Sequence, residues 1–258
     1  MTLQAADEMR RNMQGRHIVM ESPAMGRRVH VWLYGNWGAP VLVFPTAAGF
    51  AHEWDRQGMV EALAPLLRSG KIKLYCPESN VAESWTNKNA DPVWRVGRHL
   101  AYERFLLDEL VPAIRDDCRS STIRIAAAGA SLGALYAANL ALKEPEIFHY
   151  ALCLSGRYDA THFTGGFSNS DVYFNNPMAY VPLLEGAALE RVRGNTHLTL
   201  VCGQGAWEEG CIEETHRLAD LLAVKEIDHS RDIWGRDVSH DWVWWRRQAL
   251  LHLSRTFN

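Results

Sequence analysis

The stretch Ile-Arg-Ile-Ala-Ala-Ala-Gly-Ala-Ser-Leu-Gly, residues 123–133, is the most informative part of this sequence. Residues 123–128 form a short apolar run of the kind that makes a buried strand. The small and apolar residues 132–142 fit a helix that begins directly afterwards. Between them, the pattern Gly129-Ala130-Ser131-Leu132-Gly133 leaves room for a sharp turn that lifts the Ser131 hydroxyl clear of the sheet. We therefore predict that Ser131 is a nucleophile.

A serine hydroxyl is a weak nucleophile unless a base accepts its proton, and His240 is the predicted base. The chain has 11 histidines, most of which lie within predicted strands or helices. His240 instead lies in Asp-Val-Ser-His-Asp-Trp, residues 237–242, between the last predicted strand and the last predicted helix. This position fits the chain order serine, acid, histidine that is typical of nucleophiles on a strand-turn-helix.

The acid that orients His240 should follow the strand predicted at residues 198–202. Glu208 and Glu209 are both candidates, and Glu208 is preferred because it lies nearer the strand end. Either residue can alternatively stabilise the start of the following helix, where acidic groups are favourable. Asp159 and Asp228 are more distant alternatives.

Two backbone N–H groups are expected to stabilise the oxyanion that forms during attack. Leu132, at the start of the helix, should supply one of them. The loop Pro-Thr-Ala-Ala-Gly, residues 45–49, should supply the other from Ala47, with Ala48 nearly as suitable. The alternative is that this small-residue loop is simply flexible.

Short apolar runs alternate with helical patterns along the chain, which indicates a mainly parallel sheet covered by helices on both faces. The first two strands, predicted at 29–34 and 41–44, are expected in antiparallel or adjacent placement. Further strands are predicted at 72–76, 150–154, 198–202 and 232–234. We expect one α/β domain over residues 1–258, with residues 157–195 as a cap or active-site insertion.

Composition limits the functional classes. The net charge is −3 and no basic run occurs, so neither nucleic acid nor an anionic membrane is expected as a partner. No metal-ligand spacing or nucleotide-binding loop is present, so no metal and no cofactor are expected. The N-terminus lacks the apolar stretch of a signal peptide, and the five cysteines are odd in number, so the cytoplasm is the expected location.

Several stretches together resemble the "putative esterase" family of α/β-hydrolases, the branch that contains esterase D, feruloyl esterases and mycolyltransferases. The resemblance extends from about residue 28 to the end of the chain. It rests on residues 75–85, 102–104, 108–110, 172–175, 240–242 and 244–246. The pair Gln204-Gly205 resembles the loop before the acid in esterase D, which again points to Glu208. The chain departs from many members in having Glu as the acid, as mycolyltransferases do, and in its Thr-Ala-Ala-Gly loop.

The resemblance implies a serine esterase that hydrolyses a small-molecule ester or thioester through an acyl-enzyme. An acyltransferase of the same fold is the enzymatic alternative, and a non-catalytic binding protein on a hydrolase scaffold is the other. Trp85, Trp207 and Tyr173 are candidate substrate contacts, with core or interface packing as the alternative for the tryptophans. A homo-oligomer is left open.

Overall fold

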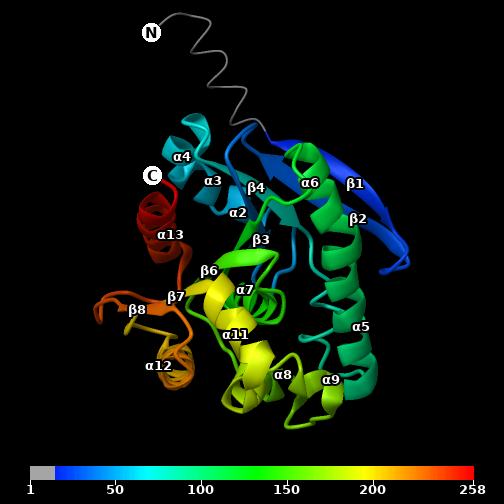
Figure 1. The fold of residues 1–258 in the computed structure, drawn as a ribbon, viewed down its shortest axis with the longest axis vertical. Helices are drawn as coiled ribbons and strands as arrows, with labels where there is room; N and C mark the ends of the chain where they lie inside the picture. The colour runs from blue at the N-terminus through cyan, green and yellow to red at the C-terminus, as the bar shows by residue number, and fades with distance from the viewer. Residues whose placement is uncertain (1–14) are drawn as a thin grey trace, which may run out of the picture.

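The computed structural model describes residues 15–258, and its centre is an eight-stranded sheet (Figure 1). The strand order is β1-β2-β4-β3-β5-β6-β7-β8. Strands β3 to β8 run parallel to one another, whereas β1 and β2 form an antiparallel edge. The strands are β1 Arg16–Ser22, β2 Arg27–Tyr34, β3 Ala39–Phe44, β4 Ile72–Pro77, β5 Ile125–Ala130, β6 Phe148–Leu154, β7 His197–Cys202 and β8 His229–Ile233.

Helices connect the parallel strands and cover both faces of the sheet (Figure 1). Those before β5 are α2 Glu53–Arg56, α3 Met59–Ala62, α4 Ala64–Arg68, α5 Pro92–Arg104, the π-helical turn η1 Phe105–Leu110 and α6 Val111–Asp117. Those after β5 are α7 Leu132–Lys143, α8 Thr161–Thr164, α9 Ser170–Tyr173, α10 Pro177–Tyr180, the 3-10 turn η2 Val181–Leu183, α11 Gly186–Asn195, α12 Glu209–Val224 and α13 Trp242–Thr256. Among the described residues, no helix is both long and apolar enough to span a bilayer.

The sheet has a hydrophobic core on each face, because successive side chains of a strand point to opposite sides. In β3, Leu42 and Phe44 pack with α5, α6 and α7, whereas Val41 and Val43 pack with α3, α4 and α13. A strand buried on both faces appears in the sequence as a continuous apolar run, which is why the central strands were predictable. The predicted α/β-hydrolase fold, a mainly parallel sheet between helices, is confirmed.

Two features of the sheet differ from the sequence-based expectation. The edge strand β1 was not predicted, because its buried and exposed positions do not form a clear apolar run. The strands β2 and β3 are antiparallel, which is one of the two arrangements expected, but they are not adjacent, because β4 lies between them and pairs with both. Strand pairing depends on contacts across long stretches of chain, which local patterns do not encode.

The chain reverses its direction of progress across the sheet at β3. From β3 it returns to β4 on one side and later passes to β5 on the other. Such a switch point leaves a crevice at the carboxyl ends of the strands, where ligands bind in open α/β sheets. The loop after β3 and the turn after β5 both lie at this point.

A buried polar cluster joins the segment 157–195 to α5 and α7. The side-chain oxygen of Asn175 accepts hydrogen bonds from Asn139 Nδ2 (2.9 Å) and Lys143 Nζ (3.2 Å), and it lies 3.0 Å from His99 Nε2. Tyr180 donates to Asn139 across 3.0 Å. These contacts fix part of the segment along α7; that the segment acts as a cap stays a prediction.

The burial of His99 predicts a loss of stability in mild acid. Burial lowers its pKa from the usual 6.5 to about 4. Between these values the unfolded chain binds more protons than the folded chain, so the free energy of unfolding falls as pH decreases through this window. We expect His99 to lower the free energy of unfolding by about 2 kcal/mol between about pH 7.5 and about pH 5. Urea unfolding at both pH values should show a smaller loss in His99→Gln than in the wild type.

Candidate active site

Ser131 occupies a strained turn between β5 and α7. Its φ angle is +55°, in the left-handed region that side chains rarely adopt, and its N–H donates to Leu154 O of β6 across 2.8 Å. A Cβ on Gly129 would lie 2.2 Å from Gly133 O, and one on Gly133 would lie 2.6 Å from Phe44 O. The two glycines of the motif are therefore required by the close approach of β5, α7 and β3. Strain of this kind is typical of functional sites.

The close packing of Gly133 gives a stability prediction with a control in the same fold. In Gly133→Ala, the new methyl group would meet Phe44 O and Pro45 O at 2.6 and 2.7 Å, and we expect a loss of about 3 kcal/mol. Gly97, an exposed helical glycine of α5, has open space around its Cα. Gly97→Ala should raise the free energy of unfolding by about 1 kcal/mol. Chemical denaturation of both variants checks this, and equal effects would contradict the packing argument.

The structure brings Ser131, His240 and Glu208 together in one hydrogen-bonded chain. His240 Nε2 lies 3.0 Å from Ser131 Oγ, and His240 Nδ1 lies 3.2 Å from Glu208 Oε2. The three residues follow β5, β8 and β7 respectively. With the Nδ1 proton donated to the carboxylate, Nε2 is free to accept the serine proton, which is the arrangement of a general base.

Glu208 is buried, with 1% of its surface exposed, and both of its carboxylate oxygens accept hydrogen bonds. Its Oε1 accepts from Ser155 Oγ (2.5 Å), and its Oε2 accepts from Cys202 Sγ (3.3 Å) as well as from His240. Burial alone would raise the pKa of Glu208, but the hydrogen bonds from His240, Ser155 and Cys202 hold it below the ordinary value of 4.5. The carboxylate is therefore charged at neutral pH and can stabilise a protonated imidazole.

The neighbouring acid and the more distant ones lie elsewhere. Glu209 is exposed as the first residue of α12, whereas Glu208 is the residue just before that helix and makes no side-chain capping bond. Asp159 accepts from Thr161 and Asn176, and Asp228 pairs with His197. These positions favour Glu208 as the partner of His240.

Backbone contacts hold the loop of His240 against the loop of Glu208. Gly205 N–H donates to Val238 O (2.8 Å), and His240 N–H donates to Ala206 O (3.0 Å). A Cβ on Gly203 would lie 2.1 Å from Val238 O, so a side chain there would separate the loops. This contact explains the glycines that flank Gln204. The loop ends at Asp241, whose side chain accepts from Val243 N and begins α13.

The loop after β3 meets the nucleophile turn, as an oxyanion site requires. A Cβ on Gly133 would lie within 2.7 Å of both Phe44 O, at the end of β3, and Pro45 O, so the start of α7 approaches this loop closely. Ala47 follows Pro45 by two residues. Among residues 15–258, the N–H groups of Ala47 and Leu132 have no hydrogen-bond acceptor. Both remain available to a substrate oxygen.

A buried glutamate fixes this loop. The backbone N–H and the hydroxyl of Thr46 donate to the two carboxylate oxygens of Glu53 across 2.7 and 2.6 Å. Burial raises the pKa of Glu53, although the bonds from Thr46 oppose the shift. The loop is thus anchored one residue before Ala47. Ala48 N–H lies 3.3 Å from the Thr46 hydroxyl, which leaves Ala47 as the freer donor.

The three candidate substrate contacts have different surroundings. Trp85 is 1% exposed and packs against the rings of His99 and Phe163, as the core-packing alternative expects. Trp207 is 82% exposed and directly precedes Glu208. Tyr173 lines a groove with Leu142 and Lys143 at the far end of α7, about 18 Å of helix away from the Ser131 end. Of the three, Trp207 alone adjoins a residue of the hydrogen-bonded chain.

The sequence analysis missed several supporting residues. Ser155 follows β6 with a φ of +49°, and its hydroxyl joins Glu208 to Trp245 Nε1, which donates to it across 3.0 Å. Its only signal was a Ser-Gly pair at a strand end. Cys211 Sγ lies 3.8 Å from His240 Nδ1. The apolar pattern of its helix gives no sign of this contact, because it involves a loop distant in the sequence.

One group of side chains meets the spacing of metal ligands within the described part of the chain. Glu208, Cys211 and His240 bring potential ligand atoms within 4.8 Å of one another. Glu208 and His240 already bind each other, and His240 also contacts Ser131. The group is thus part of the candidate active site, and the expectation of no metal and no cofactor stays a prediction.

Comparison with known proteins identifies the family of this chain. The sequence matches the family described as "Putative esterase" over residues 22–255. No curated protein matches the sequence at a significant level. The chain belongs to this esterase family and has the α/β-hydrolase fold, as the sequence resemblance implied.

Solved structures with the same fold share little sequence with this chain. A ferulic acid esterase has a TM-score of 0.76 at 16% identity, with 95% of this chain and 98% of that chain covered. The S-formylglutathione hydrolase FrmB of Staphylococcus aureus has a TM-score of 0.70 at 14% identity, with 95% and 100% covered. MPT51 (FbpC1) of Mycobacterium tuberculosis has a TM-score of 0.70 at 17% identity, with 94% and 97% covered. At these identities the likeness concerns the fold.

Proposed function

We propose that this esterase hydrolyses small or medium carboxylic esters or thioesters through an acyl-enzyme on Ser131. His240 is the general base and Glu208 the acid of the triad. The observation that carries the proposal is the chain of contacts from Ser131 Oγ to His240 Nε2 (3.0 Å) and from Nδ1 to Glu208 (3.2 Å). It supplies both requirements of a serine nucleophile, a base within reach and an oriented base.

The proposed cycle begins when His240 Nε2 takes the hydroxyl proton and Ser131 Oγ bonds to the substrate carbonyl carbon. The carbonyl oxygen becomes an oxyanion, which the N–H groups of Leu132 and Ala47 stabilise. The imidazolium then protonates the leaving alcohol or thiol as its bond to carbon breaks. Water, deprotonated by His240, attacks the acyl-enzyme and releases the acid and free Ser131. Each oxyanion donor contributes about 3 kcal/mol to such a transition state.

The apolar residues beside these groups favour a substrate with an apolar part. Trp207 directly precedes Glu208 in the chain, and Phe50 follows Ala47 by three residues; the two side chains are 82% and 55% exposed. Two of the fold neighbours are named for a ferulic acid ester and for the thioester S-formylglutathione. Both are suitable test substrates here. The predicted cytoplasmic location, the absence of nucleic-acid and membrane partners, and the oligomeric state stay predictions.

Labelling with a fluorophosphonate tests the proposal directly. We expect stoichiometric modification, located on the peptide that contains Ser131 by mass spectrometry, because the probe requires an activated serine. The labelled protein should lose all hydrolysis of p-nitrophenyl acetate. An unlabelled Ser131 would instead favour a binding protein on a hydrolase scaffold.

A second measurement determines whether water or an alcohol accepts the acyl group. Products from an ester are analysed with and without added trehalose or a simple alcohol. We expect the free acid to predominate in both, because hydrolysis transfers the acyl group to water. Predominant transfer to the added alcohol would show that the chain is an acyltransferase, whose chemistry differs only in this last step.

A further inference from the structure

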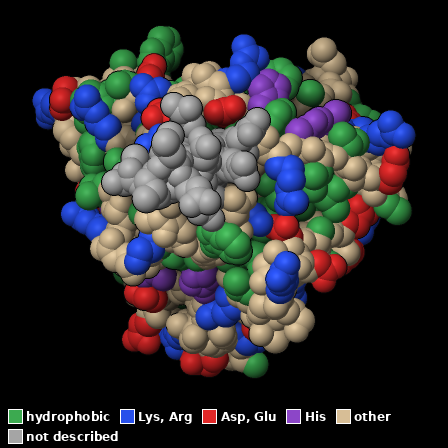
Figure 2. All heavy atoms as spheres, turned by 90° about the horizontal axis from the view of Figure 1, so that it is seen from above, with side chains coloured by type: hydrophobic (Ala, Val, Ile, Leu, Met, Phe, Trp, Pro, Cys, Tyr) green, Lys and Arg blue, Asp and Glu red, His purple; other side chains and the backbone are tan. Residues whose placement is uncertain are grey.

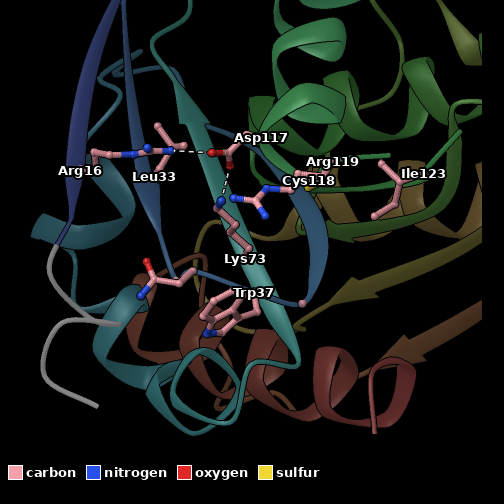
Figure 3. Close-up of a pocket in the computed structure, with 11 residues that line it drawn as sticks. Arg16, Leu33, Trp37, Lys73, Asp117, Cys118, Arg119 and Ile123 are labelled. Atoms are coloured by element: carbon pink, nitrogen blue, oxygen red, sulfur yellow. Dashed lines mark hydrogen bonds and ion pairs between the residues drawn. The ribbon is translucent and has the colours of Figure 1, made fainter. Parts of the chain in front are cut away.

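A cavity lies at the end of the sheet opposite to Ser131. Figure 3 shows the residues that line it. Its volume is about 570 Å³, within the usual range of small-molecule sites. Ile123, one of its lining residues, comes just before β5, whereas Ser131 follows the last residue of β5. The six residues of this strand span about 20 Å, so the cavity is separate from the candidate active site.

The cavity carries more positive than negative charge. Its charged lining residues are Arg16, Lys73, Arg119 and Asp117, an excess of two positive charges in a chain whose net charge is −3. On the face seen in Figure 2, cationic and acidic side chains are interspersed. The excess inside the cavity favours a negatively charged ligand.

The carboxylate of Asp117 forms ion pairs with two of these cations, Arg16 and Lys73. Asp117 Oδ1 accepts from Arg16 Nη2 (2.8 Å), and Oδ2 accepts from Lys73 Nζ and from Tyr75 Oη (2.6 Å). Burial would raise the pKa of Asp117, but these hydrogen bonds lower it to about 2, so the carboxylate stays ionised. It can nonetheless neutralise only one positive charge.

Lys73 and Arg119 retain donors for a ligand. Lys73 is 6% exposed, and among the described residues its ammonium has Asp117 as its one hydrogen-bond acceptor, so two of its protons are unused. The ring of Tyr75, whose centroid lies 5.3 Å from Nζ, also contacts the ammonium, but the ring is not one of its hydrogen-bond acceptors, so an anion would supply acceptors for the remaining protons. Arg119 is exposed, pairs with no carboxylate in residues 15–258, and extends from the end of α6 toward Lys73 in Figure 3.

We propose that this cavity binds a small organic anion, whose carboxylate or phosphate group contacts Lys73 and Arg119 and whose planar part lies against Trp37. Trp37 lines the cavity and is 66% exposed, so its ring offers a surface for stacking. Two guanidinium groups and an ammonium around one space suit a carboxylate or phosphate with several acceptor oxygens. The site is independent of the chemistry at Ser131.

Calorimetric titration of the full chain with benzoate, adenosine monophosphate and uncharged adenosine tests this proposal. We expect saturable binding of at least one of the two anions at millimolar concentration or below, and none of adenosine. Benzoate and the nucleotide separate a carboxylate from a phosphate as the preferred group. Ser131→Ala should bind the same anion equally well, because the two sites lie at opposite ends of the sheet.

Two matched variants make the test specific. Arg119→Ala should weaken binding roughly tenfold or more, because a charge-assisted hydrogen bond is lost. Arg217→Ala removes the same charge from the exposed face of α12 and should leave the affinity unchanged. Saturable binding by neither anion, unchanged affinity in Arg119→Ala, or equal weakening by Arg217→Ala would each overturn the proposal.

Discussion

In Ser131→Ala, kcat for p-nitrophenyl acetate should fall by at least about 10⁴-fold, because the proposed acyl-enzyme forms on the Ser131 hydroxyl. The variant should remain folded. Alanine keeps a Cβ at the φ angle of +55°, and the 2.8 Å bond from its N–H to Leu154 O does not involve the side chain. Steady-state kinetics and thermal unfolding of the same preparation check both expectations. Turnover near the wild-type rate would reject Ser131 as the nucleophile.

Ser155→Ala is the matched control for this variant. Ser155 also follows a parallel strand, with a φ of +49°, but its hydroxyl donates to Glu208 Oε1 (2.5 Å) and has no contact with the Nε2 atom of His240 among the described residues. Its loss removes one bond from a carboxylate that keeps others. We expect kcat to fall by roughly tenfold, about 1.4 kcal/mol. A larger loss in Ser155→Ala than in Ser131→Ala would contradict the assigned roles.

The parts of the fold that the sequence predicts are those whose signal is local. The run before Ser131 is buried on both faces of the sheet, so its apolar residues are continuous and the following glycines mark the turn. The strand β1 lies at an edge with one face largely exposed, and its sequence lacks this continuity. The insertion of β4 between β2 and β3 depends on tertiary pairing, for which no short segment carries a signal.

The candidate site shows the same division. Chain order alone indicates His240, since the histidine follows the last strand of the sheet. The preference for Glu208 over Glu209 depends on which side chain points inward, and one residue of helix rotates a side chain by about 100°. The roles of Ser155 and Glu53 depend on contacts with distant loops, so neither is visible in a local pattern. Tyr173 shows the converse: a motif can be recognised in the sequence and still lie far from Ser131.

Glu208→Gln should reduce kcat by about 10³- to 10⁴-fold while leaving the protein folded. The side-chain amide of the Glu208→Gln variant can donate a hydrogen bond to Nδ1 of His240 only when Nδ1 carries no proton. The neutral imidazole ring then carries its single proton on Nε2. In that tautomer the ring cannot accept the Ser131 proton, although it remains 3.0 Å from the hydroxyl in the present geometry. Glu209→Gln makes the same chemical change one residue away on an exposed side chain, and it should change kcat by less than about twofold.

The pH dependence of stability is a second test of the contacts of Glu208. The folded pKa of Glu208 lies below 4.5, so its favourable contribution to the free energy of unfolding is present above about pH 4.5 and is lost as pH falls through the folded pKa. Glu208→Gln should therefore flatten the acid limb of the stability curve relative to the wild type. Urea unfolding from about pH 6 to about pH 3 measures this. If Glu209→Gln were inactive while Glu208→Gln retained turnover, Glu209 and not Glu208 would be the acid of the triad.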